Sequence, residues 1–99
     1  MKAQAWIFSV RYASPGARLS SDRRAVVGPA RSSTVEAALH LAGAPEHVRV
    51  QIRGCDVVRD FVEGRLDPEQ SGYYTHNPAR EDFSDSWAVC IGSVHEVLG

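Results

Sequence analysis

Apolar and polar residues alternate near the start of the chain, and this pattern predicts a first strand over residues 3–13. The apolar positions recur at period two, which places them on one face of an extended segment: Trp6, Phe8, Val10 and Tyr12. Ser, Pro and Gly residues in 14–22 predict a loop. A second strand is expected over 23–30, and because Pro29 has no N–H to donate, it should be an edge strand or end there.

A helix is predicted from Ser33 onwards. Ser33-Thr-Val-Glu36 matches the capping box, in which each side chain would bond to the other residue's backbone N–H. Apolar residues then follow at helical spacing: Val35, Ala38, Leu39 and Ala42. Gly43 and Pro45 should end this helix.

Strict alternation returns over 47–53 and predicts a half-buried third strand. Its inward face would carry Val48, Val50 and Ile52, and its outward face His47, Arg49, Gln51 and Arg53. The apolar spacing over 56–66 favours a short helix that is capped by Asp56 and ends at Gly64, with a continued strand as the alternative.

Residues 67–86 form the longest polar stretch and are expected to be a long loop of the kind that is usually functional or disordered. A last strand is predicted at Trp87–Ile91. The sum is a single α+β domain over 1–99, with a small antiparallel sheet in ββαβ-α-β order and one or two helices on one face. Its expected core is Trp6, Phe8, Val10, Leu39, Val50, Ile52, Val89 and Ile91.

Charge is divided along the chain, although the net charge is only −1. Residues 1–55 hold eight basic and three acidic side chains, whereas 56–85 hold three basic and eight acidic ones. Either the two segments pair with each other in the fold, or the molecule has two oppositely charged faces. No secretion signal and no apolar run of membrane-spanning length is present, so a cytoplasmic location is expected, with Cys55 and Cys90 as reduced thiols.

Catalytic and metal-binding motifs are missing from the sequence. No phosphate loop, dinucleotide-binding glycine pattern or HExxH occurs, and the four histidines are scattered, so no cofactor and no metal are expected. A small enzyme built on Cys90 with His76 or His95 is one alternative. Because Cys90 falls in a predicted core strand, a structural thiol is the preferred interpretation.

The leading hypothesis is a non-enzymatic protein-binding module. Two adjacent tyrosines lie in the predicted polar loop, where aromatic side chains are least expected to be buried and where tyrosine supplies contact area at low entropic cost. Nearby acids would steer a basic partner or imitate phosphates. The alternative is that the tyrosines fold back onto the edge of the sheet. The predicted partner-binding residues are Tyr73, Tyr74, His76, Glu81, Asp82 and Asp85.

The main alternative is an RNA- or DNA-binding domain. Arginines on two predicted neighbouring strands would form a basic sheet face that contacts phosphates: Arg23, Arg24, Arg49 and Arg53. A net charge of −1 is unfavourable for non-specific nucleic-acid affinity, which ranks this function second.

The layout from Lys2 to Arg53, with the helix Ser-Ser-Thr-Val-Glu-Ala-Ala-Leu-His-Leu-Ala between strands, resembles small prokaryotic and phage accessory proteins that contain a compact ββαβ unit. Some anti-CRISPR proteins are similar in size and in their lack of enzymatic motifs. The resemblance implies a phage-encoded inhibitor in the bacterial host cytoplasm that occludes a host nucleoprotein complex. An edge strand that ends near Pro29 would permit a homodimer through sheet extension, and a monomer is the alternative. No functional residue follows from it, because it concerns layout only.

Overall fold

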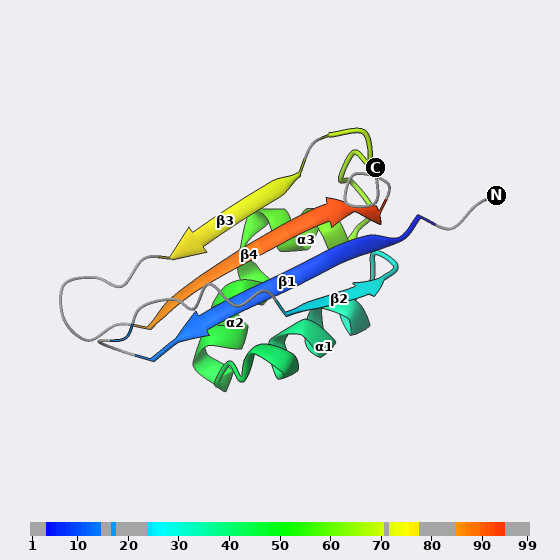
Figure 1. Cartoon of the computed structure of the whole chain (residues 1–99). Coiled ribbons are helices and arrows are strands. Elements are labelled where there is room, and N and C mark those ends of the chain that lie inside the picture. Colours follow the sequence, from blue (N-terminus) through cyan, green and yellow to red (C-terminus); the bar gives the residue numbers. More distant parts are fainter. Residues whose placement is uncertain (1–3, 15–16, 18–23, 71, 78–84, 95–99) are drawn as a thin grey trace.

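Two long strands, β1 (Trp6–Ala13) and β4 (Ser86–Ser93), form the centre of a four-stranded antiparallel sheet. Figure 1, a computed structural model of the chain, shows three helices on one side of this sheet and, among the described residues, no helix on the other. The structure describes residues 4–14, 17, 24–70, 72–77 and 85–94. The predicted α+β class with an antiparallel sheet is confirmed.

The strand order across the sheet is β2-β1-β4-β3. β2 (Ala25–Gly28) is the short edge strand expected from Pro29, and it pairs with β1. The predicted ββαβ-α-β order is wrong, because three helices separate β2 from the last two strands: α1 (Ser32–Ala42), α2 (Glu46–Gly54) and α3 (Asp56–Val62).

α1 forms where the sequence predicts it, but its first turn is not a capping box. The N-cap is Arg31 and no side chain caps the helix. Thr34 Oγ1 instead donates a hydrogen bond of 2.6 Å to the Pro29 carbonyl, which fixes the turn between β2 and α1. Gly43 ends the helix in a left-handed conformation with φ of 71°, as the sequence predicts.

α2 replaces the third strand predicted over 47–53, and this expectation was wrong. Val48 and Ile52 are fully buried, whereas Val50 is 58% exposed. On a helix, positions four apart share a face and the position between them points away. The polypeptide enters α2 from Pro45, which has no N–H to continue the hydrogen bonds of a preceding helix.

α3 confirms the favoured prediction for 56–66. Cys55 is both the C-cap of α2 and the N-cap of α3, so Asp56 lies inside α3 rather than capping it. Gly64 follows the helix with φ of 76°, a conformation that suits glycine.

The predicted loop over 67–86 contains a fourth strand, β3 (Tyr73–Asn77), which the sequence analysis missed. β3 pairs with β4 along the edge of the sheet, from Tyr73 opposite Ile91 to Asn77 opposite Trp87. Residues 67–70, 72 and 85 lie outside strands and helices in the described part of this segment.

The core lies between the helices and one face of the sheet. An aromatic cluster occupies its centre, with the Phe61 ring 6.0 Å from Trp6 and 5.0 Å from Phe8 between centroids. Every predicted core residue except Val50 is buried there: Trp6, Phe8, Val10, Leu39, Ile52, Val89 and Ile91. None of the helices in the described residues has both the length and the apolar character needed to cross a membrane.

Candidate functional site

The front of the sheet carries no helix in the described part of the chain, and we call this surface the open face (Figure 1). Because Trp6, Phe8 and Val10 point into the core, the residues between them point to the other side. Strand register extends this assignment to the neighbouring strands. The open face consists of Ile7, Ser9, Arg11 and Ala13 of β1, Ala25 and Val27 of β2, Tyr74 and His76 of β3, and Ser86, Ala88, Cys90 and Gly92 of β4. Of these residues, Ala13, Ser86 and Ala88 are buried.

Tyr74 and His76 form an aromatic pair on this face. Their ring centroids lie 5.4 Å apart at an interplanar angle of 31°. Tyr74 is 56% exposed. Two stacked rings on an edge strand give a rigid contact surface that loses little side-chain entropy when it binds a partner.

Small side chains lie next to the aromatic pair, so the middle of the open face protrudes less from the sheet than its edges do. Cys90 is opposite Tyr74 in the register, and Ser9 is opposite Cys90 on the next strand. Val27 lies at the far side of the sheet and is 62% exposed. An exposed ring at one edge and an exposed valine at the other therefore flank a shallow centre, and no acidic residue belongs to the face among the residues described.

Tyr73 belongs to the opposite side of β3, so the two adjacent tyrosines have different roles. Its ring packs against the core, and its Oη accepts a hydrogen bond of 2.7 Å from the Asp67 N–H. Tyr73 was expected to bind a partner together with Tyr74, but its position makes it a structural residue.

Asp85 also contacts this protein's own residues. Tyr12 Oη donates a hydrogen bond of 2.6 Å to Asp85 Oδ1, and the His47 imidazole pairs with the other carboxylate oxygen. The Tyr12 hydroxyl, followed by His47, lowers the pKa of Asp85, and the same contact raises the pKa of Tyr12. Asp85 thereby joins β1, α2 and the start of β4. The other two predicted acids, Glu81 and Asp82, lie outside the described residues.

Two of the four arginines predicted to share a sheet face do not lie on it. Arg49 and Arg53 belong to α2, on the helical side of the sheet. Arg49 Nε donates to the Ala44 carbonyl at 2.8 Å. Arg24 lies just before β2, and Arg23 is outside the described residues.

Arg53 is engaged in ion pairs within the helical layer. Its Nε and Nη2 bond to the two Glu36 carboxylate oxygens at 2.7 and 2.8 Å, and its Nη1 lies 3.0 Å from Glu46. This pairing lowers the pKa of Glu36 and raises that of Arg53. Arg65 similarly pairs with Asp60 and Glu63. These pairs form within each charged segment, whereas His47–Asp85 joins the two.

Cys90 was expected in the core, but its half-buried thiol faces the open side of β4. His76 lies on the same face, one diagonal position away. No hydrogen bond joins these two described side chains, so the structure does not form the Cys–His pair of a nucleophilic site. His95 lies outside the described residues. Among the residues described, no three His, Cys, Asp or Glu side chains gather as metal ligands would.

Arg11 is the residue of the open face that the sequence analysis missed. It occupies the outward position between Val10 and Tyr12 on β1, opposite Ala88, and His76 lies opposite Ala88 from the other side. The signal was available, since a charged residue within a period-two strand must point away from the buried face.

Comparison with protein-family models, with curated proteins and with solved structures found no match to this chain.

Proposed function

We propose that this protein is a non-enzymatic protein-binding module and that it binds its partner through the open face. The observation that carries the proposal is the exposed Tyr74–His76 pair beside a shallow surface of small and apolar side chains. Such a surface supplies the apolar centre of an interface, and Tyr and Arg are enriched among interface hot spots.

The chemistry of the face also supports a class of partner. Arg11 and His76 are its only ionisable cations among the described residues, and it has no acid there. A partner with an apolar patch would complement this face. Asp85, one of the acids expected to steer a basic partner, is engaged within the protein.

An inhibitor of a nucleoprotein complex, of the anti-CRISPR kind, is the specific version of this proposal. It is supported by the size of the chain and by the lack of enzymatic motifs in the sequence, but not by the ββαβ layout, because residues 47–53 lie in α2. A surface of this size would act by covering part of the target rather than by catalysing a reaction. Mutations in the open face should therefore change the fraction of the target that is bound, and not the rate of a reaction.

Nucleic-acid binding is the second candidate, because an acid-free sheet face with stacked aromatic rings is also a surface on which bases stack. We rank it lower because phosphate binding depends on several cations, and the described part of the face holds one arginine. Arg53, which was expected to contribute, has its charge compensated by Glu36 and Glu46.

The test is affinity capture from a nuclease-treated bacterial lysate with immobilised wild-type protein, Tyr74→Ala and a control. Val50→Ala is a matched control, since Val50 is 58% exposed on α2, away from the open face. We expect the same protein to be captured by the wild type and the control and to be lost with Tyr74→Ala.

Capture of that partner by Tyr74→Ala at the wild-type level would contradict the proposal. Capture that disappears on nuclease treatment and weakens steeply with salt would instead support nucleic-acid binding. Each variant is first checked for an unchanged melting temperature, because surface substitutions of this kind normally change stability by less than about 0.5 kcal/mol.

A further inference from the structure

β3 is the last strand on its side of the sheet, and we propose that its outer edge pairs with the β3 strand of a second copy of this chain. The strand order β2-β1-β4-β3 leaves β3 without a neighbouring strand on this edge among the described residues. Figure 1 shows β3 at the margin of the sheet. The proposal concerns the backbone of this edge, whereas the proposed function rests on the side chains of the open face.

The register of the sheet determines which backbone groups of β3 point outwards. In antiparallel strands, the N–H and C=O of successive residues point alternately to one neighbouring strand and to the opposite side. The Val94 N–H donates to the Ala5 carbonyl, so every second residue of β4, counted from Val94, faces β1 and the residues between them face β3. The β3 residues opposite the latter are Tyr73, Thr75 and Asn77. The N–H and C=O of Tyr74 and His76 therefore point away from β4, to the outer edge.

β3 lacks the features that protect edge strands from pairing. Natural sheets shield their edges with proline, charged side chains, bulges or very short strands. The five residues of β3 include no proline, lysine, arginine or acid, and their register with β4 is continuous. β2 has only four residues, follows Arg24 and ends just before Pro29. Sheet extension is therefore better supported at β3 than at the β2 edge that the sequence suggested.

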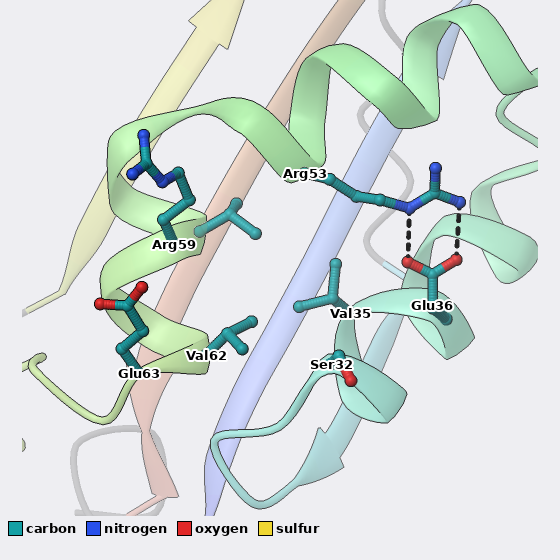
Figure 2. Close-up of a pocket in the computed structure, with 8 residues that line it drawn as sticks. Ser32, Val35, Glu36, Arg53, Arg59, Val62 and Glu63 are labelled. Carbon is teal, nitrogen blue, oxygen red and sulfur yellow. Dashed lines mark hydrogen bonds and ion pairs between the residues drawn. The ribbon is translucent and has the colours of Figure 1, made fainter.

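A pocket between α1 and α3, on the helical side of the sheet, is less suited to binding a second molecule. Figure 2 shows the Arg53 guanidinium pointing to the Glu36 carboxylate at this pocket, with two hydrogen bonds between them. Val35 and Val58 in its wall are almost completely buried. Little apolar surface is left there to be covered, whereas the outer edge of β3 leaves backbone groups to be paired.

The sequence of β3 is complementary to itself in one antiparallel register. With the two-fold axis at Thr75, Tyr74 lies opposite the partner's His76, and His76 lies opposite the partner's Tyr74. All the outward-pointing residues of both β3 strands then meet, and each pair can form two backbone hydrogen bonds. Thr75 lies opposite the partner's Thr75, a favourable cross-strand pair, and no like charges of Lys, Arg, Asp or Glu are opposed within β3. A second copy therefore matches this edge in both its backbone and its side chains.

Pairing through β3 also enlarges the open face. Because opposed residues of paired strands lie on the same face, the open faces of the two copies lie on the same side of one continuous sheet. The Tyr74–His76 pairs of both copies then lie next to each other at its centre. A target with two matching patches would be bound by both copies at once, which raises the overall affinity without any new kind of contact.

The contact is small, so we expect a weak dimer. Five residues of each copy lie in the paired strands, compared with about 20–30 residues on each side of a standard protein interface. The expected dissociation constant of the dimer is about 0.1–1 mM. Dimers of this strength form at high local concentration, for example when two copies are bound to one target.

The experiment is sedimentation equilibrium of the full chain from about 10 µM to about 2 mM, with amide hydrogen exchange measured by NMR at both concentrations. The salt concentration is about 0.15 M, which screens repulsion between the copies. We expect the mean mass to rise towards twice that of the monomer. The Tyr74 and His76 amides should exchange at least about twofold more slowly at the high concentration. The Thr75 amide faces β4 and should be protected at both concentrations.

Two pairs of variants test the geometry of the edge. His76→Pro removes an outward-pointing N–H and should weaken dimerisation at least about tenfold relative to His76→Ala, which keeps that N–H. Thr75→Lys places two like charges at the two-fold axis and should weaken dimerisation at least about tenfold relative to Thr75→Val, which preserves the side-chain shape. Melting temperatures of the dilute proteins show that each variant is folded.

A chain that stays monomeric at about 2 mM, or equal dimerisation of His76→Pro and His76→Ala, would overturn the proposal. A dimer in which β2 amides are protected instead of Tyr74 and His76 would assign the contact to the other edge and would overturn it as well. Dimerisation is measured without a binding partner. Its failure therefore leaves the capture experiment with Tyr74→Ala unaffected, and the two proposals can be told apart.

Discussion

Val48 and Val50 provide a direct test of how α2 is folded. They are identical residues two positions apart, yet Val48 is fully buried and Val50 is 58% exposed. Val48→Ala removes two methyl groups from the core. At about 0.8 kcal/mol for each buried carbon group, with an added cost for the cavity, the expected loss of unfolding free energy is about 2–3 kcal/mol.

Val50→Ala should have the opposite sign. The side chain contacts mostly water, and alanine has a higher helix propensity than valine, so stability should stay the same or rise by about 0.5 kcal/mol. Domains of this kind unfold with about 5–15 kcal/mol, so both variants remain folded and measurable.

The assay is urea unfolding followed by the fluorescence of Trp6 and Trp87, which are both buried and should change emission on unfolding. The slope of free energy against urea should be the same for the two variants, so that the midpoints report stability alone. Similar losses for Val48→Ala and Val50→Ala would refute the helix, because a half-buried strand over 47–53 would bury both valines.

Three further predictions concern single contacts. Tyr12 and His47 lower the pKa of Asp85 below its ordinary 3.8, so this carboxylate contributes its full stabilisation above about pH 5 and loses it as the pH falls through the lower folded value. Asp85→Asn should therefore flatten the decline of Tm below about pH 5. Gly28→Ala should lower the free energy of unfolding by about 1–3 kcal/mol in a urea titration, since the new Cβ would lie 2.8 Å from Thr34 Oγ1. The new Cβ of Gly54→Ala meets no atom within 4 Å, so this variant should gain about 0.5–1 kcal/mol. Equal effects of the two variants would exclude this steric explanation. Tyr73→Phe should lose about 1 kcal/mol with the hydrogen bond from Asp67, a loss that Tyr74→Phe should not show.

The misassigned α2 shows where periodicity fails over a short segment. Apolar residues at 48, 50 and 52 fit period two, but 48 and 52 alone also fit one face of a helix. Seven residues are too few to separate the two periods. The start of α2 does carry helix signals, with Pro45 at the cap and an acid, Glu46, in the first turn.

β3 was missed for a different reason. Polarity over 67–86 suggested a loop, yet Tyr and Thr are frequent in strands, and an edge strand needs only one half-buried face. Tyr73, Thr75 and Asn77 supply that face with partial burial, a pattern that hydrophobicity alone does not detect.

The bonding partner of the Glu36 carboxylate could not be predicted from any local pattern in the sequence. The spacing of Glu36 from Ser33 matches a capping box, but its carboxylate bonds to Arg53, seventeen residues further along the chain. The long, regular elements β1, α1 and β4 were predictable because their apolar residues repeat over several periods. The Tyr74–His76 pair depends on how β3 and β4 are aligned, and this register cannot be read from a short stretch of sequence.

The pairing of β1 with β4 also sets the time at which the sheet can form during translation. Trp6 lies opposite Ser93 and Ala13 opposite Ser86, so β1 lacks its main neighbour until β4 has left the ribosome. At about 5–20 residues per second, this delay is on the order of 4–16 s. Throughout it, the Trp6, Phe8 and Val10 side chains have no β4 residues to pack beside. The nascent chain therefore presents a strongly apolar strand that chaperones can bind, and it completes its core only after nearly the whole described sequence has been made.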